Sequence, residues 1–249
     1  MLKFLLLECL LLLFGQLTPE NKKVKIFLAG DSTMSIKKTA KYPETGWGMP
    51  FTYFWDSSVT VINKAQNGRS TRTFREVGIW PSIISELEKG DYIFIQFGHN
   101  DASKDRPKEY VAPDQYKINL IQYVADVRAK GGIPILITPP GRRRFDPTGK
   151  LRESHELYSP KVLEVAKEQK TLFIDLDKKS MELYRKFGEE KSRLLFLHLK
   201  KGEHPNYPNG LEDDTHFNEL GARYIAQIVL AELRKMNLDL KSRIIVPAK

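Results

Sequence analysis

Cysteine is almost absent from this sequence of 249 residues, whose only cysteine is Cys9. Because Cys9 lies in an apolar stretch near the amino terminus, a mature chain without that stretch has neither a disulfide framework nor a thiol nucleophile. The apolar run itself is shorter than the roughly 20 residues that a membrane-spanning helix needs. The sequence also lacks internal repeats and any linker rich in glycine, proline or serine. These absences favour a single domain, which we place at residues 22–240.

The amino-terminal segment 1–17 differs from the rest of the chain. Lys3 precedes a leucine-rich run that ends near Phe14, which is the pattern of a secretory signal peptide. Glu8 interrupts the run and no small-x-small cleavage site follows it, so an uncleaved anchor is the alternative. We expect a signal peptide over 1–17 and a secreted or periplasmic protein.

Acidic residues are in deficit, since 31 aspartates and glutamates face 40 lysines and arginines and leave a formal net charge of +9. The basic residues are scattered, apart from Arg142-Arg143-Arg144, and no nucleic-acid-binding motif accompanies them. We therefore expect no nucleic-acid partner. An acidic polysaccharide would account for both the charge and the export.

Short apolar stretches alternate along the chain with stretches of helical periodicity. The expected strands cover 24–28, 59–62, 92–97, 133–137 and 171–174. The expected helices cover 49–55, 79–87, 116–127, 154–167, 177–187 and 220–233, and the segment 198–211, rich in Gly, Pro and Asn, is expected to be a loop. Such alternation predicts an α/β fold with a parallel sheet, right-handed crossovers and helices on both faces.

A serine follows the first expected strand in the sequence Gly30-Asp31-Ser32-Thr33. The carboxyl ends of strands are where open α/β sheets bind their ligands, but a serine at such a place can also cap the next helix. Ser32 becomes an effective nucleophile only if a base takes its proton. Met34 stands where the pattern Gly-x-Ser-x-Gly requires its second glycine, which argues against the nucleophile elbow of the α/β-hydrolases.

His216 is the best placed of the five histidines to act as that base. It precedes the last expected helix, and Asp213 stands three residues earlier. In a turn or a first helical coil this spacing lets the carboxylate accept the ring N–H and fix the tautomer, whereas Asp214 would face away. An N-terminal capping cluster for the helix is the alternative.

Two other positions could donate hydrogen bonds to an oxyanion. Gly68 allows its backbone N–H to approach a substrate closely, and Asn100 offers a side-chain amide. Each of them could instead serve only in a turn or a cap.

Taken together, these blocks resemble, in order, those of the GDSL/SGNH hydrolases: Gly30-Asp31-Ser32, Gly68, Gly98-His99-Asn100-Asp101 and Asp213-x-x-His216. Within that superfamily the chain is most similar to the rhamnogalacturonan acetylesterases, on the stretches 30–33, 67–74, 96–101 and 213–218. The resemblance implies a flavodoxin-like, three-layer α/β/α sandwich with a five-stranded parallel sheet. The number of strands expected above agrees with that fold.

The resemblance also implies serine esterase chemistry without a metal or an organic cofactor. Ser32 would be the nucleophile, His216 the base and Asp213 the acid that orients it. The N–H groups of Ser32 and Gly68 and the amide of Asn100 would form the oxyanion hole. The implied reaction is hydrolysis of acetyl esters on the galacturonic acid units of pectic rhamnogalacturonan.

Several residues near these blocks are candidates for contacts with the substrate. They are Arg69, Arg72 and His99, together with the run 142–144. A guanidinium can bind a uronate carboxylate, although each arginine could equally be a solvated surface residue.

Other interpretations are open at this point. Asp213 and three histidines, His198, His204 and His216, offer ligands for a zinc-dependent hydrolase, although their spacing fits no known metal motif. A carbohydrate-binding protein without activity is a second alternative. An esterase for another substrate, such as acetylated xylan or a lipid ester, is a third. The sequence does not specify an oligomeric state.

Overall fold

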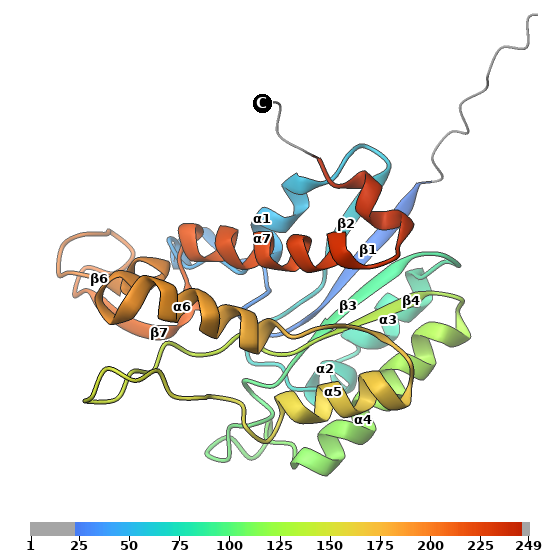
Figure 1. The fold of residues 1–249 in the computed structure, drawn as a ribbon, viewed down its shortest axis with the longest axis horizontal. Helices are drawn as coiled ribbons and strands as arrows, with labels where there is room; N and C mark the ends of the chain where they lie inside the picture. Colours follow the sequence, from blue (N-terminus) through green and yellow to red (C-terminus); the bar gives the residue numbers. More distant parts are fainter. Residues whose placement is uncertain (1–22, 246–249) are drawn as a thin grey trace, which may run out of the picture.

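The computed structural model describes residues 23–245, which fold around one five-stranded parallel sheet (Figure 1). Its strands are β1 (Val24–Gly30), β2 (Val59–Asn63), β3 (Tyr92–Gln96), β4 (Ile133–Ile137) and β5 (Leu172–Ile174). The expected α/β class and five parallel strands are confirmed. The segment 1–17, and with it the predicted signal peptide, lies outside the described residues. Within 23–245 no helix has the length and apolar character needed to cross a membrane.

The strands follow the order β2-β1-β3-β4-β5, so the chain moves from β1 to one side of the sheet and then crosses to the other side. This reversal places the carboxyl ends of β1 and β3 next to each other, and ligands bind at such a point in open α/β sheets. Ser32 follows β1 and Asn100 follows β3. The topology therefore brings two of the candidate residues to one edge of the sheet.

Alternating side chains along the strands build one core on each face of the sheet. In β1, Ile26 and Leu28 belong to one buried cluster, while Phe27 and Ala29 belong to the other. The first cluster packs under α1, α6 and α7, and the second packs under α3, α4 and α5 (Figure 1). The result is a three-layer α/β/α sandwich.

The helices agree in most of their bounds with those expected. They are α1 (Gly48–Phe51), α2 (Thr73–Glu76), α3 (Ile79–Glu86), α4 (Pro113–Ala129), α5 (Ser159–Glu168), α6 (Leu176–Ser192) and α7 (Glu219–Lys235), with short 3-10 turns η1 (Thr39–Lys41), η2 (Thr52–Phe54), η3 (Arg193–Leu195) and η4 (Asp239–Arg243). Helix α5 begins later than the expected 154. Helix α6 is longer than expected and bends at Gly188, which has a left-handed φ of 74°.

Two strands were not expected from the sequence: β6 (Phe196–Leu199) and β7 (Leu211–Phe217), which pair antiparallel beside the main sheet (Figure 1). Phe196 pairs with Phe217 but the next residue of β6 pairs with Asp213, so residues 214–216 form a bulge. Asp213 and His216 therefore lie in a bulged strand that turns between them, and not in the first coil of the last helix. Their polar sequence hides the strand, because it lacks the apolar alternation by which strands are recognised.

Candidate active site

The candidate residues converge on one cleft of about 740 Å³ at the carboxyl edge of the sheet. Its lining includes Ser32, Gly68, Asn100, Asp213 and His216. Three of these follow β1, β2 and β3, and the other two come from the bulged strand β7. Residues separated by as many as 184 positions in the sequence are thus neighbours in space.

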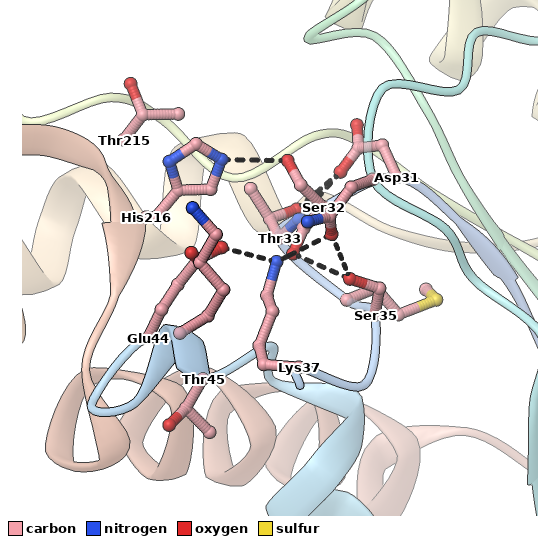
Figure 2. A network of polar contacts seen from close by, with 12 residues as sticks. Asp31, Ser32, Thr33, Ser35, Lys37, Glu44, Thr45, Thr215 and His216 are labelled. Carbon is pink, nitrogen blue, oxygen red and sulfur yellow. Dashed lines mark hydrogen bonds and ion pairs between the residues drawn. The ribbon is translucent and has the colours of Figure 1, made fainter. Parts of the chain in front are cut away.

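A chain of hydrogen bonds links three of these side chains. Nε2 of His216 lies 3.0 Å from Oγ of Ser32 (Figure 2), and Nδ1 of His216 lies 2.7 Å from Oδ2 of Asp213. The other oxygen of Asp213, Oδ1, accepts the backbone N–H groups of Thr215 at 2.7 Å and His216 at 3.0 Å. These bonds make the bulge a turn built around the Asp213 carboxylate.

The charge state of Asp213 determines which nitrogen of His216 carries the proton. Burial by itself raises the pKa of this carboxyl, but the hydrogen bonds and charge of His216 outweigh it and lower the pKa to about 2. An ionised carboxylate can only accept, so Nδ1 of His216 must donate to it. Nε2 is then left with a lone pair that faces the Ser32 hydroxyl and can take its proton.

A buried network holds the turn that carries Ser32. Asp31 Oδ1 accepts the N–H of Thr33 at 3.0 Å, its hydroxyl at 2.8 Å and the side-chain amide of Gln96 at 3.2 Å. Gly30 is required there, because a Cβ would lie 2.7 Å from the carbonyl oxygen of Gln96. The turn after β1 is thereby fixed against β3.

The two expected oxyanion donors stand on neighbouring loops. Gly68 has a left-handed φ of 72°, which glycine adopts without strain, and a Cβ at this position would meet no atom within 4 Å. The Asn100 side chain is buried and donates from Nδ2 to the carbonyl oxygen of Arg69 at 3.0 Å. Asp101 joins the same loops by accepting the N–H and hydroxyl of Thr71 at 2.9 and 2.6 Å. Both donors therefore line the cleft beside Ser32.

The three residues expected to contact the substrate lie in different places. Arg72 donates to the carbonyl oxygens of Pro107 and Lys108, and it lines a neighbouring hollow together with Arg69 rather than the cleft. His99 lines the cleft, but burial and then the facing His155 hold its pKa well below the usual range. A neutral His99 offers no positive charge to a uronate.

The basic run 142–144 divides between the cleft and the interior. Arg142 and Arg144 line the cleft. Arg143 is buried instead, and binds Oδ1 of Asp214 at 2.7 Å and the hydroxyl of Ser192 at 2.9 Å. Sequence reasoning missed Lys41 and Arg106, which also line the cleft, because their loops carry no periodic or motif signal.

The alternative zinc site is not favoured by the geometry. Within residues 23–245, no group of three His, Cys, Asp or Glu side chains is placed to hold a metal ion. Nε2 of His198 lies 2.7 Å from Asp214 rather than beside Asp213. His204 lines a separate hollow with Tyr42 and Tyr53. The four residues proposed as ligands therefore belong to three different surroundings.

Two proteins of Bacillus subtilis (strain 168) are similar to this chain over most of its length. A rhamnogalacturonan acetylesterase of Bacillus subtilis (strain 168) is 38% identical over 225 residues, which cover 90% of this chain and 96% of that protein. A probable rhamnogalacturonan acetylesterase of the same organism is 35% identical over 221 residues, covering 88% of this chain and 97% of that protein.

Solved structures agree on the fold. The protein YxiM of Bacillus subtilis superposes with a TM-score of 0.75 at 27% identity, covering 88% of this chain and 58% of that longer one. An acetylxylan esterase from Geobacillus stearothermophilus has a TM-score of 0.62 at 19% identity, with 86% and 95% covered. The GDSL-like lipase/acylhydrolase family matches residues 28–224. The chain therefore belongs to the GDSL-like lipase/acylhydrolase family and is a carboxylic ester hydrolase.

Proposed function

We propose that this protein is a serine carbohydrate esterase that removes O-acetyl groups from pectic rhamnogalacturonan. The observation that carries the proposal is the unbroken hydrogen-bond chain from Asp213 through His216 to Ser32, which opens on a cleft lined by basic side chains. Each of the three side chains has the role that its contacts allow: Ser32 is the nucleophile, His216 the base and Asp213 the acid that orients it.

The first half of the reaction forms an acetyl-enzyme. Ser32 Oγ attacks the acetyl carbonyl carbon while His216 Nε2 takes the hydroxyl proton. The carbonyl oxygen becomes an oxyanion, which the N–H groups of Ser32 and Gly68 and the Asn100 amide stabilise. The bond to the sugar oxygen then breaks, and His216 returns the proton to the departing sugar hydroxyl.

The second half releases acetate. Water attacks the acetyl-serine carbonyl as His216 Nε2 takes one of its protons, and the same donors bind the second oxyanion. When the Ser32–acyl bond breaks, the proton passes to Ser32 Oγ and the enzyme is restored. Asp213 remains ionised throughout and stabilises the imidazolium that forms in each half.

The charge of the cleft supports an acidic substrate. Its lining carries four basic side chains, Lys41, Arg106, Arg142 and Arg144. The acidic side chains of the same lining are Glu44, Asp105 and Asp213, of which Glu44 is paired with a lysine and Asp213 with His216. The unpaired balance is positive, which favours a polymer of galacturonic acid over neutral xylan. The names of the curated relatives agree with this choice.

Acetate release from a panel of acetylated pectins and acetylated xylans tests the proposal, with the Ser32→Ala protein as a control. We expect acetate from rhamnogalacturonan at a higher kcat/KM than from xylan, and nearly none from the variant. A folded Ser32→Ala protein with full activity would exclude the serine route. Higher kcat/KM on xylan would exclude the pectic substrate while leaving the esterase mechanism intact.

We also infer that the segment 1–17 directs export, because its charge and apolar run have the pattern of a signal peptide. Fractionation of the producing cells and amino-terminal sequencing of the exported protein test this inference. A protein found inside the cell with Met1 retained would contradict it.

A further inference from the structure

An ion pair lies buried beside the nucleophile. Nζ of Lys37 is 2.6 Å from Oε1 of Glu44, and the two side chains are only 1% and 10% exposed. Burial lowers the pKa of Lys37, although the hydrogen bond and charge of Glu44 oppose that shift. Such a pair is costly to desolvate, and apolar side chains of similar volume would often stabilise a fold as well. Its presence here calls for a role other than stability.

The same ammonium group makes two further hydrogen bonds. Nζ of Lys37 donates to the carbonyl oxygen of Ser32 at 2.5 Å (Figure 2) and to Oδ1 of Asn67 at 2.8 Å. Together with the bond to Glu44, these use all three of its N–H groups. Ser35 supports this arrangement, since its hydroxyl donates to Asn67 Oδ1 at 2.6 Å and lies 3.3 Å from the Ser32 carbonyl oxygen.

These bonds join two loops that follow different strands. Ser32 follows β1, whereas Asn67 follows β2 and directly precedes Gly68. Lys37 therefore ties the carbonyl of the nucleophile to the residue before an expected oxyanion donor. A movement of either loop would have to break at least one bond of a fully engaged ammonium group.

The orientation of the Asn67 amide follows from the same contacts. Because Lys37 can only donate, the amide oxygen must face it, and the NH₂ group faces away. Within the described residues Nδ2 makes no hydrogen bond, and Asn67 lines the cleft. The amide NH₂ group is thus a free donor in the lining of the cleft, next to the Gly68 backbone.

We propose that Lys37, held by Glu44, is a positioning residue that fixes Ser32 against the Asn67–Gly68 loop and aims the Asn67 amide at an oxygen of the bound glycan. The fixed spacing keeps the Gly68 N–H at the oxyanion for any acetyl ester. The Asn67 contact adds binding only where the substrate has a sugar. The second half rests on the proposed carbohydrate esterase function, whereas the first half requires only ester hydrolysis.

The double variant Lys37→Met/Glu44→Met tests the first half, because it removes both charges and leaves no unpaired charge behind. With 4-nitrophenyl acetate, which has no sugar, we expect kcat to fall about 10- to 100-fold with KM changed less than about threefold, as for a small misplacement of reacting groups. The single variant Lys37→Arg, which keeps a cation beside Glu44, should lose less kcat than the double variant. Lys179→Met, which breaks the exposed pair with Glu182 on α6, is the matched control and should leave kcat unchanged.

The outcomes separate a positioning role from a structural one. If the double variant melts within a few degrees of the wild type and keeps more than half of its kcat, the positioning role is refuted. If it fails to fold, Glu44→Gln replaces it, and a kcat equal to the wild type in that variant refutes the role in the same way. A reduced kcat at an unchanged KM in a folded variant supports it.

Asn67→Ala tests the second half with acetylated rhamnogalacturonan. We expect kcat/KM to fall on both esters, because the variant also removes the oxygen that accepts from Lys37, and to fall about tenfold further on the glycan, as for one lost substrate hydrogen bond. Equal losses on both esters would overturn the glycan contact. A wild-type protein that hydrolyses 4-nitrophenyl acetate but no acetylated glycan would refute the proposed function, and the Lys37 test would still stand.

Discussion

Replacing Asp213 with asparagine separates the orienting role of this carboxylate from its role in the fold. Oδ1 of Asp213 accepts two backbone N–H groups, at 2.7 and 3.0 Å. In the variant the amide oxygen must keep that position, because an NH₂ group there would face two other donors. The NH₂ group then occupies the place of Oδ2 and donates to Nδ1 of His216.

This exchange forces the wrong tautomer on His216. With a donor opposite Nδ1, the ring carries its proton on Nε2, so that an N–H rather than a lone pair faces the Ser32 hydroxyl. A serine enzyme with this defect loses about 10⁴ in kcat, or about 5.5 kcal/mol of transition-state stabilisation. The two backbone hydrogen bonds to residue 213 survive and the third reverses its direction and loses its charged partner, so we expect the free energy of unfolding to fall by only about 1 kcal/mol.

Asp214→Asn is the matched control, since it changes the neighbouring aspartate by the same atoms. Asp214 binds Arg143 and His198 and makes no hydrogen bond to His216. We expect this variant to keep kcat within about threefold and to lose about 1 kcal/mol of stability, because the amide oxygen still accepts from the buried Arg143 guanidinium but no longer carries a charge. The two variants should therefore lose similar amounts of stability, whereas only Asp213→Asn should lose most of its activity.

Hydrolysis of 4-nitrophenyl acetate near pH 7.5 measures kcat, and urea denaturation followed by circular dichroism measures stability. An Asp213→Asn enzyme that keeps more than a tenth of the wild-type kcat would refute the orienting role of Asp213. An inactive Asp214→Asn enzyme would refute it equally, since Asp214 would then be the orienting acid.

Asn100→Ala should lower kcat about 10²- to 10³-fold with little change in KM, and a loss under twofold would remove Asn100 from the oxyanion hole. Burial raises the pKa of Asp101 to about 7, so the folded state keeps a proton that the unfolded chain loses near 3.8, and stability falls as the pH rises through 7. Between pH 5 and 8 the wild type should lose about 3 kcal/mol more than Asp101→Asn in urea titrations, and parallel curves would contradict this assignment. Arg144→Gln should raise KM about tenfold for acetylated rhamnogalacturonan and leave KM for acetylated xylan unchanged, whereas equal effects at low and high salt would argue against a uronate contact.

Much of the fold could be predicted because its strands are covered on both faces. β3 and β4 read as nearly continuous apolar runs, which mark a parallel sheet buried under helices. The positions of Ser32 and Asn100 followed from the strands that precede them. Such apolar runs predict strands correctly because they reflect the burial of the strand directly.

The parts that escaped prediction depend on contacts between distant residues. Strand β7 is polar because its side chains serve the site, so it lacks the alternation that would reveal a strand. The pairs Lys37 with Asn67 and Arg143 with Asp214 join residues 30 and 71 positions apart. No periodicity encodes such pairs, and only the three-dimensional arrangement decides which basic residues are buried and which face the cleft.

The nucleophile and its donors stand at the ends of strands, whereas Arg106, Arg144 and Tyr207 reach the cleft from connecting segments. Connecting segments accept insertions and exchanges at small entropic cost. Transplanting the segments 102–111, 142–152 or 200–210 from a relative is therefore a route to enzymes that deacetylate different polymers with unaltered acyl chemistry. The residues that hydrolyse the ester and the segments that contact the polysaccharide therefore belong to different parts of the fold. This separation makes the scaffold a starting point for directed evolution toward other plant cell-wall polymers.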